Sequence, residues 1–173
     1  RPDWSRLTGD PDGELEVLLG LFPPDEHPDL ATWADATRSH QAEVLRIQIE
    51  AMRRRKYQPC GGFALDRLLD AEPCISGSLL DHDRQPKPAQ AAVTTACATT
   101  IVVADPLPRR LRRGATLLTD VAVVHDGRED LGLTRIDAHL DIAGETLTWA
   151  WEGEIGADSS VHVGRIEWPT GNA

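Results

Sequence analysis

Residues 131–151 read LGLTRIDAHLDIAGETLTWAW, two runs of strand-forming residues joined by a glycine-containing turn. From residue 136 to residue 142 an apolar side chain falls at every second position. Because successive side chains of a β-strand point to opposite faces, this alternation places one face inward and the other outward. The stretch therefore predicts an antiparallel pair of strands with one buried face.

Strand-like runs continue on both sides of this stretch. They cover residues 101–103, 115–124, 131–141, 145–151 and 160–168, and turn residues separate them at 126–127, 143–144 and 153–158. Short strands at this spacing are typical of an antiparallel β-sandwich. A linker rich in Pro and Arg, residues 105–114, marks the predicted boundary of this domain.

The residues before this boundary favour helices. Residues 1–28 are rich in Pro, Gly and Asp and predict a long connection, with a short apolar run at 15–22 that suits one or two helical turns. Apolar residues then recur at helical spacing, which predicts one helix over residues 30–56 with a possible break near Ser39. Asp29 is the expected N-cap of this helix and Pro59 its stop.

After Pro59, residues 61–65 (GGFAL) form a glycine-led apolar stretch that predicts a buried strand. An alanine-rich helix is expected over residues 89–97, because prolines suit its first turn. The order helix, strand, loop, helix is that of the last unit of a (β/α)8 barrel. The predicted fold class is α/β plus all-β: the end of a barrel over residues 1–104, followed by an antiparallel β-sandwich over residues 105–173.

Composition excludes several classes of partner. The formal charge of −10 argues against nucleic acid, and the basic run at residues 53–56 is better explained by cations at the C-terminal end of a helix dipole. No stretch approaches the roughly 18 to 20 apolar residues that a membrane span needs. Three cysteines without a CxxC pair and the lack of a targeting segment predict a cytoplasmic protein with reduced thiols. A chain that opens on Arg1 is expected to be processed or part of a longer protein.

Clusters of polar residues give no strong site. Asp81, His82 and Asp83 suggest either a metal or acid–base cluster or a turn, and the turn is favoured because consecutive side chains diverge. The remaining histidines show no HxH or HExxH spacing, so neither a metal nor a cofactor is expected. Trp149 and Trp151 share one face of a strand, where they either fill the core or stack on carbohydrate, and the core is favoured.

A series of motifs resembles the end of the catalytic barrel of family 2 glycoside hydrolases of the β-mannosidase type. The motifs are Gln41-Ala42-Glu43, Glu50, the Arg-rich helix end at 53–59, Gly61-Gly62-Phe63, Asp70 and Pro73, Leu80-Asp81-His82, and Pro86-Lys87-Pro88. The resemblance covers roughly residues 29–104, and its specificity lies in the order of these independent motifs. The strand-rich region that follows is similar to the immunoglobulin-like domain that trails the barrel in this family.

The resemblance implies retaining hydrolysis of a β-mannoside-like carbohydrate by two glutamates, an acid/base and a nucleophile. Neither of the family's catalytic contexts, Asn-Glu and Ser-Glu-Phe/Tyr-Gly, occurs here, so no catalytic residue is expected in this chain and the pair is expected upstream. Asp70 is the candidate substrate-binding residue, with a loop-bracing carboxylate as its alternative role.

Three positions depart from the family. Gly77 replaces the tryptophan of the Ser-Trp-Ser segment, which removes a sugar-stacking platform, and Asp66 and Arg67 are unusual in a barrel strand. A degenerate paralogue or a decaying gene fragment would explain all three. The alternative function is a non-catalytic β-sandwich module that binds carbohydrate or a partner protein and to which a barrel remnant is attached.

Overall fold

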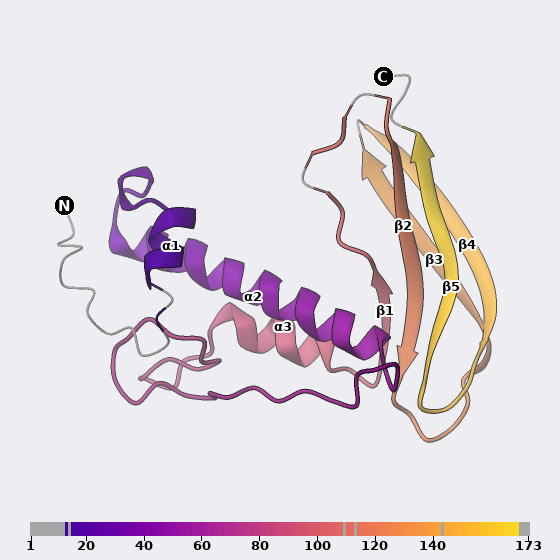
Figure 1. Ribbon diagram of the computed structural model, residues 1–173, viewed down its shortest axis with the longest axis horizontal. Helices are drawn as coiled ribbons and strands as arrows, with labels where there is room; N and C mark the ends of the chain where they lie inside the picture. Colours follow the sequence, from indigo (N-terminus) through magenta and orange to yellow (C-terminus); the bar gives the residue numbers. More distant parts are fainter. Residues whose placement is uncertain (1–12, 14, 109, 113, 143, 170–173) are drawn as a thin grey trace. The chain divides into compact units, whose positions relative to one another are not determined.

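A computed structural model of the chain describes residues 13, 15–108, 110–112, 114–142 and 144–169 (Figure 1). The chain forms two compact units. The first contains the described residues up to Ile49 together with Phe63–Cys97, and the second contains Glu50–Gly62 and the described residues from Ala98 onward. Each unit has buried apolar residues of its own, among them Trp33 in the first and Val124 in the second.

The helices are α1 (Leu15–Leu21), the short 3-10 helix η2 (Pro24–Glu26), α2 (Leu30–Arg54) and α3 (Pro88–Ala96). Asp29 caps α2: its Oδ1 accepts a hydrogen bond from the backbone N of Thr32 at 2.8 Å. The long predicted helix is confirmed, and it runs without a break at Ser39. The helix predicted over residues 89–97 is confirmed as α3, which begins at Pro88.

The strand predicted at residues 61–65 is wrong. This segment has no regular secondary structure, and the side chains of Phe63 and Leu65 are 38% and 39% exposed. Pairing on either side of the segment consists of isolated bridges, which join Lys56 to Cys60 and Leu80 to Leu69 and Pro86. A strand needs neighbouring strands to satisfy its backbone N–H and C=O groups, and the part of the first unit that the structure describes contains none.

The second unit holds all five predicted strands in two antiparallel sheets. β2 (Thr116–His125) lies between β1 (Thr100–Ala104) and β5 (Ser159–Pro169), and β3 (Gly132–Ile142) pairs with β4 (Glu145–Ile155). Strands of both sheets contribute to one hydrophobic cluster, which consists of Val123, Ile136, Ile155, Trp151, Val161 and Val163. The mixture of helices with antiparallel sheets is consistent with the predicted β-sandwich region.

The two tryptophans of β4 lie half-buried on the face predicted from their spacing. Trp151 pairs across the sheet with Ile136 and packs against the hydrophobic cluster. Its indole lies over Gly164 so closely that a Cβ on that glycine would be 2.2 Å from the indole Nε1. This packing favours a core role for Trp151 over carbohydrate stacking.

The basic run at the end of α2 forms ion pairs within the second unit. Arg53 Nη2 lies 2.7 Å from Asp126 Oδ2, and Lys56 Nζ bonds to Asp126 and lies 2.6 Å from Asp158 Oδ1. The Tyr57 hydroxyl donates to Asp158 Oδ2 at 2.7 Å. These cations are neutralised by neighbouring carboxylates, which is the arrangement of a structural network rather than of a phosphate-binding face.

Candidate functional site

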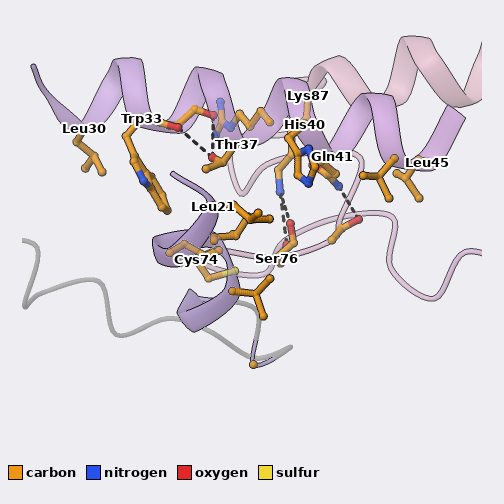
Figure 2. Close-up of a pocket in the computed structure, with 18 of the residues that line it drawn as sticks. Leu21, Leu30, Trp33, Thr37, His40, Gln41, Leu45, Cys74, Ser76 and Lys87 are labelled. Atoms are coloured by element: carbon orange, nitrogen blue, oxygen red, sulfur yellow. Dashed lines mark hydrogen bonds between the residues drawn. The ribbon is translucent and has the colours of Figure 1, made fainter. Parts of the chain in front are cut away.

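A pocket of about 720 Å³ lies in the first unit between α1, α2 and the loop at residues 73–77 (Figure 2). Its lining residues on α2 follow one another at three- and four-residue spacing, which places them on one stripe of the helix. That stripe consists of Leu30, Trp33, Ala34, Thr37, Arg38, His40, Gln41, Val44, Leu45 and Gln48. The opposite walls come from α1 and from the loop.

Trp33 forms a fixed wall of the pocket. The residue is 2% exposed, and its indole Nε1 donates to the carbonyl oxygen of Phe22 at 2.9 Å. The Phe22 ring in turn contacts the imidazole of His40, with 5.3 Å between the ring centroids. These contacts join the N-terminal half of α2 to the segment that follows α1, so the indole is held in place by hydrogen bonding and by packing.

Gln41 attaches the loop to α2. Its Nε2 donates to the carbonyl oxygens of Gly77, at 2.8 Å, and Ser78, at 3.0 Å. Figure 2 shows the Gln41 side chain reaching from the helix to this loop. The loop has no regular secondary structure, so such side-chain bonds take the place of a backbone ladder in fixing its position.

A buried ion pair also holds this loop in position. Lys87 Nζ lies 3.0 Å from Asp70 Oδ2, and the two residues are 5% and 4% exposed. Lys87 also donates to Ser78 Oγ at 2.8 Å and to the carbonyl oxygen of Ser76 at 3.3 Å, while the Ser76 hydroxyl bonds to Asp70 Oδ1. Ser76 and Lys87 line the pocket, so Asp70 contacts two lining residues.

The pKa of Asp70 reflects opposing effects. Burial favours the neutral acid and raises the pKa, whereas hydrogen bonds from Ser76, Lys87 and Ser78 and the charge of Lys87 favour the carboxylate. The bonds and the charge prevail, so the pKa of Asp70 lies below its ordinary value. The pair is therefore a carboxylate and an ammonium ion, each with several hydrogen-bond partners, as a buried charge pair requires.

Gly77 leaves the pocket open. A Cβ on this residue would meet no heavy atom within 4 Å, and its backbone needs no left-handed conformation. Gly77 is also a lining residue. The position at which the resembled family carries a tryptophan is thus an opening in the pocket wall, with room for a side chain.

The other residues singled out in the sequence lie elsewhere. Asp81 forms the predicted turn, because its Oδ1 accepts bonds from the backbone N of Asp83, at 3.0 Å, and of Gln85, at 2.8 Å. Asp66 is exposed and Arg67 is half-buried. Among the described residues no group of three or more His, Cys, Asp or Glu side chains is placed to hold a metal ion. No helix within the described residues is both long enough and apolar enough to cross a membrane.

Two features of the site were missed in the sequence. One is Lys87 as the partner of Asp70, for which a signal existed: Lys87 is the sole charged residue between Arg84 and Asp105. A charged residue that is buried is almost always paired. The other is the pocket wall formed by α1, which no local pattern indicates, since it depends on how the connection folds back.

A comparison with solved structures shows a protein with a similar fold. The chain is similar in structure to the β-D-mannosidase from Dictyoglomus thermophilum, with a TM-score of 0.63 and 24% sequence identity. The likeness is one of fold. It covers 80% of this chain and 16% of the mannosidase chain, so the chain spans about a sixth of the length of that protein. No protein-family model and no curated protein matches the sequence.

Proposed function

We propose that the chain is the C-terminal region of a retaining glycoside hydrolase of family 2, of the β-mannosidase type, and that the complete protein hydrolyses a β-mannoside-like carbohydrate. The observation that carries this proposal is the similarity in fold to a segment of a β-mannosidase. The ordered motifs between residues 29 and 104 support it independently. In this proposal the first part of the chain ends a catalytic barrel, and the strand-rich part is the trailing immunoglobulin-like domain, with the boundary at residue 104.

The proposal assigns both catalytic glutamates to the sequence upstream. A retaining pair needs two carboxyl groups about 5 to 5.5 Å apart that face one sugar. Glu43 and Glu50 lie on α2 and do not line the pocket, and Glu16 lies exposed on α1. Glu14 lies outside the described residues. The chain by itself is therefore expected to be inactive.

Asp70 contributes to substrate binding, in this proposal, through its neighbours. It is buried and paired, so its carboxylate holds Lys87 and Ser76 at the pocket wall. Loops after barrel strands build the active sites of such enzymes, and the segment from Asp70 to Lys87 occupies that place in the resembled family. An alternative role for Asp70, a brace for the loop alone, predicts no effect on substrate affinity once the protein is folded.

The activity test compares the isolated chain with the complete protein. With an aryl β-mannoside, the complete protein is expected to release the phenol and the isolated chain is not. Asp70→Asn in the complete protein should raise KM more than it lowers kcat, whereas Asp66→Asn, at an exposed position, should change neither. Turnover by the isolated chain would refute the assignment of the glutamates, and a complete protein inactive on β-mannosides and related β-glycosides would refute the proposed activity.

A further inference from the structure

The pocket offers a cation to a ligand. Among the lining residues that the structure describes, Arg38 and Lys87 carry a positive charge, and none is an aspartate or a glutamate. Lys87 is already paired with Asp70 at 3.0 Å, so its charge is balanced within the protein. Arg38 is therefore the charged group that the pocket can use to bind an anion.

The guanidinium of Arg38 has hydrogen-bond donors to spare. Asp81 Oδ2 lies 3.8 Å from Arg38 Nη2, which is beyond hydrogen-bond distance, and the guanidinium donates no hydrogen bond to another described residue. The side chain is 40% exposed, so this loose ion pair contributes little stability. A guanidinium presents five N–H donors in a planar fork, which fits a carboxylate through two parallel hydrogen bonds. Arg38 can therefore bind a carboxylate of a ligand and keep its contact with Asp81.

His40 adds a group that suits the hydroxyls of a sugar. The residue is half-buried in the pocket lining, and Figure 2 shows its imidazole on the side of α2 that faces the loop. Neither ring nitrogen has a hydrogen-bond partner among the described residues, where every fully buried side-chain nitrogen or oxygen does have one. The His40 nitrogens are therefore open to solvent. An imidazole can donate and accept hydrogen bonds, as a hydroxyl can.

Arg38 lies within one helical turn of the contact between α2 and Gly77. Gln41, three residues after Arg38 on the same stripe, donates to the carbonyl oxygen of Gly77 at 2.8 Å. Residues three apart on a helix are neighbours, with about 5–6 Å between their Cβ atoms. A Cβ on Gly77 would meet no heavy atom within 4 Å. The opening at Gly77 therefore leaves room for a substituent of a sugar beside this stripe.

We propose that the carbohydrate bound in this pocket is an acidic sugar, a β-mannoside-like substrate that carries a carboxylate at C6. Arg38 binds the carboxylate, and His40 hydrogen-bonds to a hydroxyl of the sugar ring. The inference rests on the proposed function and names the substrate class of that same site. Asp70 keeps the role given to it above, because it holds Lys87 and Ser76 at the pocket wall.

The test compares two substrates of the complete protein, 4-nitrophenyl β-mannoside and 4-nitrophenyl β-mannuronide, which differ only in the carboxylate at C6. We expect kcat/KM to be at least about tenfold higher for the mannuronide, which corresponds to one hydrogen bond to a charged group. Arg38→Met removes the cation and should lower the ratio of the two kcat/KM values at least about tenfold. Arg46→Met is the matched control, because Arg46 is an exposed arginine of the same helix that does not line the pocket, and it should leave the ratio unchanged.

Circular dichroism first establishes that each variant is folded, and Arg38→Gln replaces Arg38→Met if the latter does not fold. The inference is overturned if the wild-type protein hydrolyses the mannoside at least as well as the mannuronide, or if the Arg38 variant keeps the wild-type ratio. It is also overturned if the Arg46 variant lowers the ratio as much as the Arg38 variant does. Turnover of the mannoside without a preference for the mannuronide refutes this inference alone. A protein that hydrolyses neither substrate nor a related β-glycoside refutes the proposed function, and the inference with it.

Discussion

Removal of Lys87 should destabilise the first unit strongly. Lys87→Met keeps most of the side-chain length but leaves Asp70 as a carboxylate that is 4% exposed and without its cation. Breaking a buried pair from one side typically costs about 3–5 kcal/mol, because the remaining charge is still desolvated. Ser76 continues to bond to the carboxylate, so we expect a loss near the lower end, about 3 kcal/mol.

The double variant distinguishes a charge pair from simple packing. Asp70→Asn with Lys87→Met removes both charges, so it should be less destabilised than the sum of the single variants by at least about 1 kcal/mol. Urea unfolding followed by far-UV circular dichroism gives the free energies, and hydrogen exchange across residues 70–87 locates the change. Asp66→Asn is the control for the loss of an exposed carboxylate. Additive single effects would refute the account of a coupled pair.

The pair also gives the stability a pH dependence of known sign. The folded-state pKa of Asp70 lies below its ordinary value of 3.8, so the folded protein binds the proton less tightly than the unfolded chain. The contribution of the carboxylate is therefore fully present above the unfolded pKa, and it is lost as the pH falls through the folded pKa. The difference in stability between the wild type and Asp70→Asn should shrink below about pH 4. A difference that stays constant to lower pH would contradict this cause.

Three further predictions concern other contacts. Lys56→Met should lower the free energy of unfolding of the second unit by about 1 kcal/mol at neutral pH, because the carboxylates that Lys56 contacts are partly exposed. Urea titration should show that this loss becomes smaller in acid, as Asp126 and Asp158 are protonated. Gly164→Ala should cost about 1–3 kcal/mol by collision with the Trp151 indole, whereas Gly153→Ala, whose Cβ would lie 3.7 Å from Val163, should be tolerated; equal thermal unfolding of the two would refute this. Asp29→Ala should lower the free energy of unfolding and increase hydrogen exchange in the first turn of α2, and unchanged exchange there would exclude the cap.

The sequence predicted the secondary structure correctly where its periodic pattern of apolar residues was long. The helical period over residues 30–56 and the alternation around Ile136 and Trp151 gave α2, β3 and β4 with small errors at the ends. β4 continues to Ile155, so the turn after it is shorter than predicted. The strand predicted for the GGFAL segment at 61–65 was wrong, because five apolar residues form a strand only if other strands are present to pair with them.

The candidate site was predicted in part. Asp70 was placed in the loop that precedes the pocket residues, but its burial and its pairing with Lys87 were not expected. The departure at Gly77 was visible in the sequence, and the structure adds that the position is open and lines a pocket. The role of Asp70 in substrate binding stays a prediction.

The sequence by itself determined the local elements: a capped helix, a proline-started helix and five strands, each specified by residues that are close together in the chain. Only the tertiary structure decided which polar groups became buried and which apolar residues faced an open space. Asp70 and Lys87 meet because the loop between them folds back, and the stripe on α2 becomes a pocket wall because α1 and the loop lie opposite it. Periodicity reports the preference of one segment, whereas burial and ion pairing depend on what the rest of the chain places beside it.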